Sequence, residues 1–572
     1  MASSRRRRAE RARPREAVPA AVTATPPAAA DRWTTRGPLL AAAVALAVYL
    51  PSLAGGFLYD DVAIVVENRR IQDLGALGTV LRYEPSRPLL SLTWAVNYAL
   101  AGRTPWPYHL VNVFVHAGNA LLVASLFLWM ARRRPGPHRR GGAVLGACLF
   151  AATPMAAETV AYVASRSTAL ASLFVLASLR LAVSALETES RFRHAAALGL
   201  FLLALSTKEE AAAAPLLLLL LDFFFLAGQD AGPLRRRWRW HAAFWLLPFL
   251  GLLARRMATG DWLPPAVLPR GQYLLTQWAA FPLYLLRALV PLDPAFFRDA
   301  TPASWPPSTA IVAWGLLAAA VALAAILGRR RWPDFSFAVA WMAAALVPSS
   351  SIVPLNEMVV DHRAYLGGAG VLFAVGSAVW RPERRYFAAA LLALLAARAW
   401  HYQRVLGDPV RAWEDAVQRA PRSADAYRGL AEAYASRGDP RAEPTLKHAA
   451  SLAPADSRAW ANLGVQYAAS GRLEDAVTAF RAALRVDPGD ARTHDNLGLV
   501  LQALGRLEEA KAEYEAAAAV DPRLAQPRIR LAAILLEQGD RDRARALVEE
   551  AARLEIDPAD AEAIQALRQR LR

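Results

Sequence analysis

The hydrophobic positions of the chain gather in long blocks before Trp400, and no comparable block follows that residue. An apolar helix of about 20 residues is long enough to cross the ~30 Å hydrocarbon core of a bilayer. A further apolar stretch, Gln272 to Val290, contains Pro282 and either crosses the membrane or lies within its outer boundary. We therefore predict an all-α, polytopic membrane domain of about eleven transmembrane helices over residues 38–400. These helices start near Leu39, Tyr108, Gly142, Thr168, His194, Ala211, His241, Ser308, Phe335, Ala364 and Tyr386.

Arginine clusters separate alternate hydrophobic blocks, and positively charged loops are retained in the cytoplasm. All clusters lie on one side if the Gln272 stretch does not cross, so the N-terminus is predicted to be cytoplasmic and the C-terminal region extracytoplasmic. Residues 1–37, rich in Pro, Ala and Arg, are predicted to form a disordered basic tail. The clusters are Arg5–Arg8, Arg132–Arg140, Arg191 with Arg193, Arg235–Arg239, Arg329–Arg331 and Arg381–Arg385. The opposite loops are 54–105, 154–166, 207–210, 258–308 and 349–363.

After residue 400 the pattern becomes periodic, with a spacing of 34 residues between equivalent positions. A 34-residue period is the signature of tetratricopeptide repeats, which stack into an α-solenoid. Residues 401–572 are therefore predicted to form such a domain, whose groove binds extended polypeptide. A solenoid that only packs on its own membrane domain is the alternative. The best copy contains Trp460, Leu463, Gly464, Tyr467, Ala476, Phe480, Ala483 and Pro488, and a half repeat with Trp413, Ala416 and Pro421 joins the array to the membrane domain.

The composition agrees with this division. Hydrophobic residues make up 55% of the chain, the mean hydropathy is +0.20, and the formal net charge is +17. Such a hydrophobic fraction excludes disorder for most of the chain. A basic excess can indicate nucleic-acid binding, but the topology of the loops already accounts for the arginines, so we expect no nucleic acid as a partner. The single cysteine, Cys148, excludes an intramolecular disulfide and a cysteine-rich metal site.

The candidate chemistry lies in the outer loops, above all in two adjacent carboxylates, Asp60 and Asp61, directly after the first predicted span. Ionised groups near hydrocarbon are costly and usually functional. One of them could accept the proton of an attacking hydroxyl while the other orients the acceptor or a metal such as Mg²⁺ or Mn²⁺. Alternatively, both acids cap a short surface helix over Ala63 to Val66. The spacing alone does not decide between these interpretations.

Other polar groups recur on the same outer side, and each could simply be an interfacial residue that keeps its charge in water. Two of them, Arg255 and Arg256, break the positive-inside pattern. A lipid phosphate is the natural ligand for such outer arginines, because guanidinium pairs with phosphate in a bidentate way. The remaining candidates for donor or substrate binding are Glu158, Arg166, Lys208, Glu209, Asp361, His362, Arg363 and Tyr365.

An ordered series of motifs in this chain resembles the transmembrane-and-tetratricopeptide-repeat family of O-mannosyltransferases. The resemblance covers about residues 38–560. It rests on Phe57-Leu58-Tyr59-Asp60-Asp61, Glu67-Asn68, Ile71, Arg87-Pro88-Leu89, Asn97-Tyr98, Tyr108-His109-Leu110-Val111-Asn112, His116, Asn119, Pro154, Glu158, Arg166, Lys208-Glu209 and Asp361-His362-Arg363-Ala364-Tyr365-Leu366. Three positions depart from the family pattern: Thr153 replaces a usual His, Asp361 a usual Glu, and Gly367 a usual Pro.

The resemblance implies a GT-C membrane fold and transfer of a sugar, commonly mannose, from a polyprenyl-phosphate donor to Ser or Thr hydroxyls of extracytoplasmic proteins. By analogy, Asp60 would be the base, and Arg255 or Arg256, with Arg363 as a further candidate, would bind the lipid phosphate. An integral protein of the cytoplasmic membrane is expected, with membrane lipid, the lipid-linked donor and a polypeptide acceptor as partners. Two alternatives remain: an inactive membrane-anchored scaffold for envelope proteins, and a ligase that acts on lipid-linked glycan.

Overall fold

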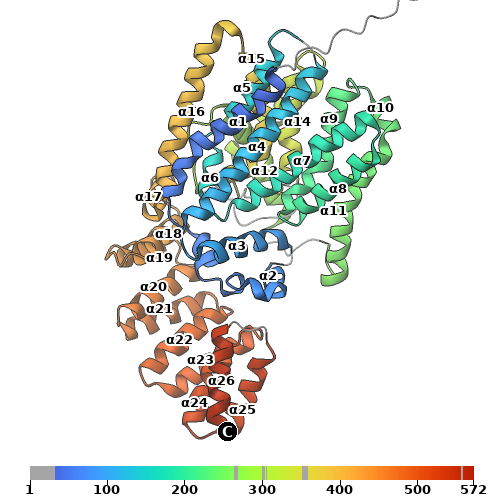
Figure 1. The fold of residues 1–572 in the computed structure, drawn as a ribbon. Coiled ribbons are helices and arrows are strands. Elements are labelled where there is room, and N and C mark those ends of the chain that lie inside the picture. Colours follow the sequence, from blue (N-terminus) through green and yellow to red (C-terminus); the bar gives the residue numbers. More distant parts are fainter. Residues whose placement is uncertain are drawn as a thin grey trace, which may run out of the picture.

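The computed structural model describes residues 32–572, except 85, 135, 263–267, 299–302, 304–305, 351–357 and 555–557. The described residues form helices and no β-strand, which confirms the all-α prediction. Figure 1 shows two parts: a bundle of long helices, and an array of shorter helix pairs that extends from one end of the bundle to the C-terminus. Most of the basic tail predicted at the N-terminus lies outside the described residues, and the first helix begins at Arg32 rather than at residue 38.

A helix occupies every position where a membrane span was predicted. Four of them, at Trp33–Ala54, Trp106–Arg133, Arg166–Thr188 and Thr309–Leu327, are long and apolar enough to cross a membrane by length and composition. The count of eleven crossings stays a prediction. The bundle consists of α1 (Arg32–Tyr49), α4 (Trp106–Arg133), α5 (Arg139–Ala152), α7 (Arg166–Thr188), α8 (Arg191–Leu205), α9 (Ala214–Leu221), α11 (Trp238–Thr259), α12 (Arg270–Leu289), α13 (Thr309–Leu327), α14 (Pro333–Leu346), α15 (Ala364–Val379) and α16 (Arg385–Leu406), with the short α6 (Ala156–Ala161) and α10 (Ala231–Arg236) between them.

Helix α12 is the apolar stretch for which the sequence does not decide whether it crosses the membrane. Near its start, the Tyr273 hydroxyl donates to the carbonyl of Ser349 at 2.6 Å, and near its end Arg287 pairs with Asp361 at 2.8 Å. Ser349 and Asp361 both belong to the connection between α14 and α15. Both ends of α12 therefore contact the same connection, as expected for a helix that does not cross the bundle from end to end.

The connection between α1 and α4 carries the two adjacent acids and lies at the end of the bundle nearest the repeats (Figure 1). It contains three 3-10 turns, a π-helical turn over Val62–Val66, α2 (Leu77–Tyr83) and α3 (Pro88–Ala101). Helix α3 starts with Pro88 in its first turn, where the missing N–H of proline costs nothing.

The repeats follow α17 (Pro409–Arg419) as the pairs α18 (Ala424–Ala435) with α19 (Ala442–Leu452), α20 (Ser457–Ala469) with α21 (Leu473–Val486), α22 (Ala491–Ala503) with α23 (Leu507–Val520), and α24 (Gln526–Glu537) with α25 (Arg541–Ala552), and end at α26 (Pro558–Leu571). Gly464 and Gly498, one period apart, each lie where a Cβ would be less than 3 Å from an aromatic ring, that of Phe480 or Tyr514. Glycine at this position allows the two helices of a pair to approach closely, which explains its recurrence.

The first repeat helices share one hydrophobic core with the bundle. Buried residues of this core run from α1 through α16 and continue into α17, α18 and the start of α19, including Trp413, Leu430 and Tyr434. A second core holds the later repeats together. The predicted boundary at residue 400 lies inside α16, and no break in packing occurs there.

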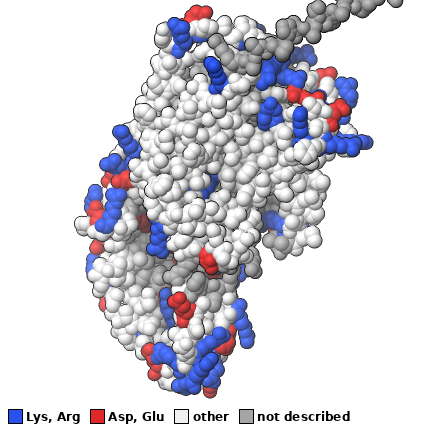
Figure 2. Space-filling view, viewed as in Figure 1, with Lys and Arg blue, Asp and Glu red and all other residues white. Residues whose placement is uncertain are grey.

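Charged side chains gather at the two ends of the molecule. Figure 2 shows a broad uncharged band over the bundle, with lysines and arginines near the end where α5 begins and mixed charges over the repeats. An uncharged band of this kind is the surface expected of a helical bundle embedded in a bilayer.

Candidate active site

The loop with the two acids makes a sharp turn at Tyr59, whose backbone lies in the left-handed region with φ of 48°. For a residue with a side chain this conformation costs roughly 1–2 kcal/mol, so neighbouring contacts must hold it. The Tyr59 ring packs edge-on against Trp413 of α17 at 5.3 Å between centroids, and less closely against Phe296. Upstream, the N–H of Gly56 donates to the carbonyl of Gly407 at 3.1 Å. The repeat domain therefore holds the acidic loop in place.

Asp61 is fully buried and bonds to the backbone. Its carboxylate accepts the N–H of Leu58 at 3.0 Å, of Val163 at 3.3 Å and of Ala164 at 2.7 Å. Burial raises the pKa of Asp61 to about 7, against the lowering effect of these three donors. Its side chain does not cap the following π-helical turn. The capping interpretation thus finds no support for Asp61, which ties the first outer loop to the loop that precedes α7.

Asp60 differs from its neighbour in being exposed. The Tyr162 hydroxyl accepts the backbone N–H of Asp60 at 3.2 Å and also makes a hydrogen bond with its carboxylate. Partial desolvation by the surrounding protein raises the pKa of Asp60, and the Tyr162 hydrogen bond opposes the rise. An accessible carboxylate with a raised pKa has the properties of a general base.

A second group of charges surrounds Glu158 of α6. His362 Nδ1 lies 2.7 Å from Glu158 Oε1, whereas Glu158 Oε2 is buried and has no hydrogen-bond partner among the described residues. Burial and the negative charge of Asp361 raise the pKa of Glu158, while His362, Lys208 and Arg298 lower it. Because a buried carboxylate oxygen without a partner is costly, Oε2 is a natural acceptor for a ligand hydroxyl.

Asp361 joins this group to two arginines that the sequence analysis did not select. Its carboxylate pairs with Arg287 at 2.8 Å and Arg298 at 3.4 Å, and it accepts the N–H of Ala295 at 3.0 Å. The Nε atom of Arg298 is buried and has no partner among the described residues. We call Glu158, Asp361, His362, Arg287 and Arg298 the charged cluster. Among its buried side-chain atoms, the acceptor Glu158 Oε2 and the donor Arg298 Nε have no hydrogen-bond partner in the described part of the chain, and we call these two atoms open.

Residues 293–298 connect the charged cluster to the acidic loop and to the repeats. Ala295 donates to Asp361, as described above, and the next residue, Phe296, donates its N–H to the Tyr402 hydroxyl. The Phe296 ring packs against Tyr162 at 5.8 Å and Trp413 at 5.2 Å. Asp293 at the start of the segment pairs with Arg419 of α17. The two parts of the site are therefore held by one short segment.

The other predicted site residues make hydrogen bonds and ion pairs within the protein. Arg166 is fully buried and donates to Asn112 Oδ1 at 2.8 Å and to the carbonyl of Tyr108 at 3.0 Å. Lys208 donates to Thr168 Oγ1 at 2.7 Å and pairs with Glu210. Glu209 accepts two hydrogen bonds from Arg87. Arg363 donates to the Met358 carbonyl and to the Tyr273 hydroxyl. The Tyr365 hydroxyl bonds to His116 and Asn119.

Arg255 and Arg256 lie at the end of α11, which packs mainly on α8 and α9. No described interaction connects Arg256 to the charged cluster or to Asp60. Arg287 and Arg298, which the sequence analysis did not select, pair with Asp361 of the charged cluster. The same signal, a basic residue in an outer loop, was present at Arg298 within residues 258–308 but was hidden by the acidic and proline-rich character of that loop.

Two departures from the family pattern have local structural counterparts. A Cβ at Gly367 would lie 2.5 Å from the Met342 sulfur, so α14 occupies the space that a larger residue would need. Thr153 is buried, and its hydroxyl has no partner among the described residues, while its carbonyl accepts the Tyr49 hydroxyl at 2.6 Å. A histidine-dependent contact is missing at this second position.

The acids do not form a good cation site. Within the described ranges, no group of three or more potential metal ligands is present. Both carboxylate oxygens of Asp61 are taken up by backbone N–H donors, so the Asp60–Asp61 pair does not present two open carboxylates. These residues do not fit the Mg²⁺ or Mn²⁺ site considered from the sequence.

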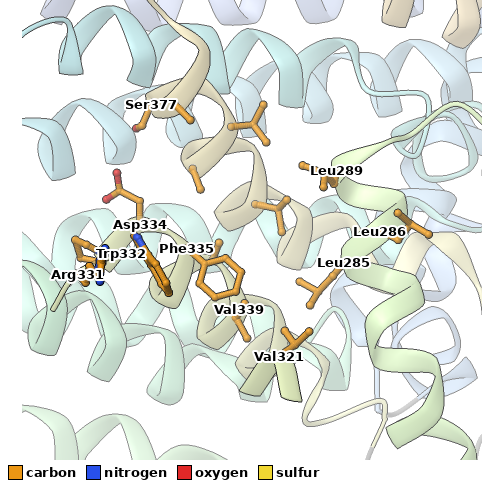
Figure 3. A pocket seen from close by; sticks show the side chains of 16 residues that line it. Leu285, Leu286, Leu289, Val321, Arg331, Trp332, Asp334, Phe335, Val339 and Ser377 are labelled. Atoms are coloured by element: carbon orange, nitrogen blue, oxygen red, sulfur yellow. The ribbon is translucent and has the colours of Figure 1, made fainter. Parts of the chain in front are cut away.

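An apolar cavity of about 610 Å³ lies beside the end of α12 (Figure 3). Leu285, Leu286 and Leu289 line it on the α12 side, and Phe335 and Val339 of α14 face them. Arg287 lies between these leucines in sequence and points instead to Asp361. The end of α12 thus has one apolar face toward the cavity and one basic side chain in the charged cluster.

Comparison with known proteins gives matches to parts of the chain. Residues 408–568 match the model of a family described as Cilia and flagella-associated protein 70 C-terminal domain. Protein O-mannosyl-transferase TMTC2 of Mus musculus is 34% identical over 157 residues, which cover 25% of this chain and 18% of the relative. TMTC3 of Homo sapiens is 30% identical over 181 residues, which cover 29% of this chain and 19% of the relative. The chain thus matches less than a quarter of the length of these relatives.

Among solved structures, the crystal structure of MamA is 21% identical, with a TM-score of 0.24, and covers 27% of this chain and 89% of that chain. A structure described as functional characterization of Pseudomonas aeruginosa pilF is 20% identical, with a TM-score of 0.26. The match covers 30% of this chain and 82% of that chain. The relatives found by sequence are named protein O-mannosyl-transferase. Over about a quarter of its length, this chain is homologous to protein O-mannosyl-transferases of the TMTC family.

Proposed function

We propose that the chain is a membrane glycosyltransferase that moves a sugar, mannose by analogy with its relatives, from a polyprenyl-phosphate donor to Ser or Thr hydroxyls of extracytoplasmic proteins. The observation that carries the proposal is the accessible Asp60 carboxylate with its raised pKa. It stands in a loop connected through residues 293–298 to a charged cluster with an open donor at Arg298 Nε and an open acceptor at Glu158 Oε2. The relatives that are named protein O-mannosyl-transferases support the same reaction class.

In the proposed reaction, the Asp60 carboxylate takes the proton of a Ser or Thr hydroxyl. The hydroxyl oxygen then attacks the anomeric carbon, and the bond between that carbon and the lipid phosphate oxygen breaks. The phosphate leaves with the bonding electron pair, and the configuration at the sugar is inverted. A positioned base contributes about 10²- to 10⁴-fold to such a step. Charge neutralisation of the leaving phosphate supplies the second contribution.

The donor phosphate is assigned to Arg298, assisted by Arg287, rather than to Arg255 or Arg256. Arg298 Nε is an unused donor, and guanidinium binds phosphate oxygens well. A sugar hydroxyl would donate to Glu158 Oε2. The polyprenyl chain is assigned to the apolar cavity beside α12, because Leu286 and Leu289 flank Arg287 in sequence and line that cavity.

The acceptor polypeptide is assigned to the face made by the first helices of the repeat pairs. Neighbouring first helices contact one another, as in the pairs Arg458–Asp425 and Arg530–Asp495. Val465 and Leu499, one period apart on this face, are 48% and 47% exposed and offer apolar positions for a bound chain. At the start of the array, Arg428 interacts with Tyr59, the residue before Asp60. A polypeptide along this face would reach the acidic loop.

The proposed orientation has the arginine-rich loops in the cytoplasm and the repeats outside, in the cytoplasmic membrane. The positive-inside rule supports it, and so does α12, both ends of which contact the connection between α14 and α15. Eleven crossings place Asp60 and the repeats on the same side.

The test is transfer by the purified full-length protein in lipid nanodiscs. Polyprenyl-phosphate mannose, polyprenyl-phosphate glucose and a nucleotide-linked mannose are offered separately, each with a Ser/Thr-rich protein and, in a parallel reaction, with a lipid-linked glycan as acceptor. Mass spectrometry records the hexose added to either acceptor. We expect transfer from a lipid-linked sugar and its loss in Asp60→Asn. Transfer to a lipid-linked glycan alone would indicate the ligase, and no transfer from any donor by a correctly folded protein would indicate the scaffold.

A further inference from the structure

At the opposite end of the bundle from Asp60, a cavity of about 890 Å³ opens between the ends of α1, α4, α5 and α16. It is lined mainly by arginines and tryptophans contributed by four separate stretches of the chain. None of these residues belongs to the acidic loop or to the charged cluster. The residues that define this basic cavity are Arg132, Arg139, Arg140, Arg385, Trp33 and Trp380.

The positive charge of the basic cavity is only partly neutralised. One acid, Asp334 at the start of α14, pairs with Arg139 and is shared with Arg134. Arg132 has no ion-pair partner in the described part of the chain. The described contacts of Arg385 are a hydrogen bond to the hydroxyl of Tyr386 and a cation–π contact with the ring of the same residue. Arg132 and Arg385 thus face this space without an acidic partner among the described residues, which leaves a surplus of positive charge for an anionic ligand.

The walls of the basic cavity are rigid and aromatic. Trp33 and Trp380 pack edge-on with ring centroids 6.4 Å apart. Trp380 lies against Gly141, where a Cβ would come within 2.0 Å of its indole nitrogen, so only glycine allows the ring to occupy this position. Tryptophan side chains favour the membrane–water interface, because one part of the ring is apolar and the other is polar. The cavity therefore has the chemistry of a site at the level of lipid headgroups.

We propose that the basic cavity binds the phosphate headgroup of an anionic phospholipid of the cytoplasmic leaflet. The arginines would contact the phosphate oxygens, and the two tryptophans would pack on the glycerol and the first methylenes of the acyl chains. Basic pockets between transmembrane helices on the cytoplasmic side are suited to such headgroups. The N-terminal tail of this chain is itself rich in arginine, so its charge does not complement the cavity. This site is independent of the proposed transferase reaction.

Binding of phosphatidylglycerol and of phosphatidylcholine to the purified full-length protein in detergent, followed by native mass spectrometry, tests the proposal. The double variant Arg132→Gln/Arg385→Gln removes two cavity charges, and the matched control Arg191→Gln/Arg235→Gln removes two exposed arginines elsewhere. Because the cavity variant loses two charged hydrogen-bond donors, we expect its affinity for phosphatidylglycerol to be weaker by at least about tenfold. The control and the charge-preserving Arg132→Lys/Arg385→Lys variant should change much less.

Three outcomes would overturn the proposal. An equal loss of phosphatidylglycerol affinity in the control variant would mean that binding depends only on the net charge of the protein. Equal affinity for phosphatidylcholine would exclude an anionic site. Full displacement of the lipid by inorganic phosphate at the same concentration would assign the basic cavity to a soluble anion. Folding of each variant is checked by the reactivity of the buried Cys148 toward a thiol-reactive dye on heating.

Discussion

Adjacent substitutions at Asp60 and Asp61 should have opposite consequences. Asp60 is exposed, so Asp60→Ala should change the free energy of unfolding by no more than about 0.5 kcal/mol. Asp61→Ala leaves two buried backbone N–H groups and one partly buried one without their acceptor. Each such loss costs about 1–3 kcal/mol, so Asp61→Ala should destabilise the protein by at least about 3 kcal/mol.

Activity should follow the reverse order. Asp60→Asn keeps the size of the side chain and removes its basicity, so the rate of transfer should fall by at least about 100-fold. Asp61→Asn retains one acceptor oxygen, and its folded fraction should keep more activity than Asp60→Asn. Transfer per folded molecule is measured with lipid-linked mannose and a short Ser/Thr peptide.

Stability is measured on the same samples through Cys148, which is buried and becomes reactive when the bundle opens. The reasoning would be refuted if Asp60→Asn transferred sugar at a near-normal rate, or if Asp61→Ala melted like the wild type. Loss of activity in Asp61→Asn with unchanged melting, together with an active Asp60→Asn, would exchange the roles of the two acids.

Four further expectations follow from the site and its surroundings. Tyr162→Phe removes a hydrogen bond that lowers the pKa of Asp60, so the acid limb of the pH–rate profile should move to higher pH; a shift to lower pH would contradict the assignment. Arg298→Gln should weaken binding of the lipid-linked donor at least about tenfold, whereas Arg256→Gln should not, as measured by native mass spectrometry. The reverse result would indicate that the arginines of α11 bind the donor phosphate. Truncation after Ala453 keeps the helices that share the core of the bundle, so donor binding should stay intact while glycosylation of full-length proteins falls more than that of short peptides. A reporter fused to the C-terminus should be active outside the cytoplasm, and cytoplasmic activity would mean that α12 crosses the membrane.

Periodic features of this chain were predictable because they depend on local geometry. The 34-residue spacing predicted the repeat helices, since each pair places the same small and large residues at the same contacts. The hydrophobic blocks likewise predicted the positions of the bundle helices. The first helix nevertheless starts at Arg32, before the apolar block, and the core of the bundle continues past residue 400.

The relation between the acids could not be predicted in this way. Sequence adjacency made Asp60 and Asp61 equivalent. They differ because Asp61 is buried and accepts the N–H groups of Val163 and Ala164, about 100 residues later, in addition to that of the nearby Leu58. Arg298 was missed for a similar reason, because its role depends on Asp361 rather than on its own neighbours. Such long-range contacts leave no periodic signal along the chain.

The contact between Tyr59 and Trp413 also has a consequence for synthesis of the protein. A ribosome makes the acidic loop long before it makes α17, so the turn at Tyr59 has no aromatic partner while most of the bundle is being inserted. The loop can reach its final form only after some 350 further residues have been added. A chain that stops before α17 would therefore reach the membrane with its acids present but without the Trp413 contact that supports the turn before them.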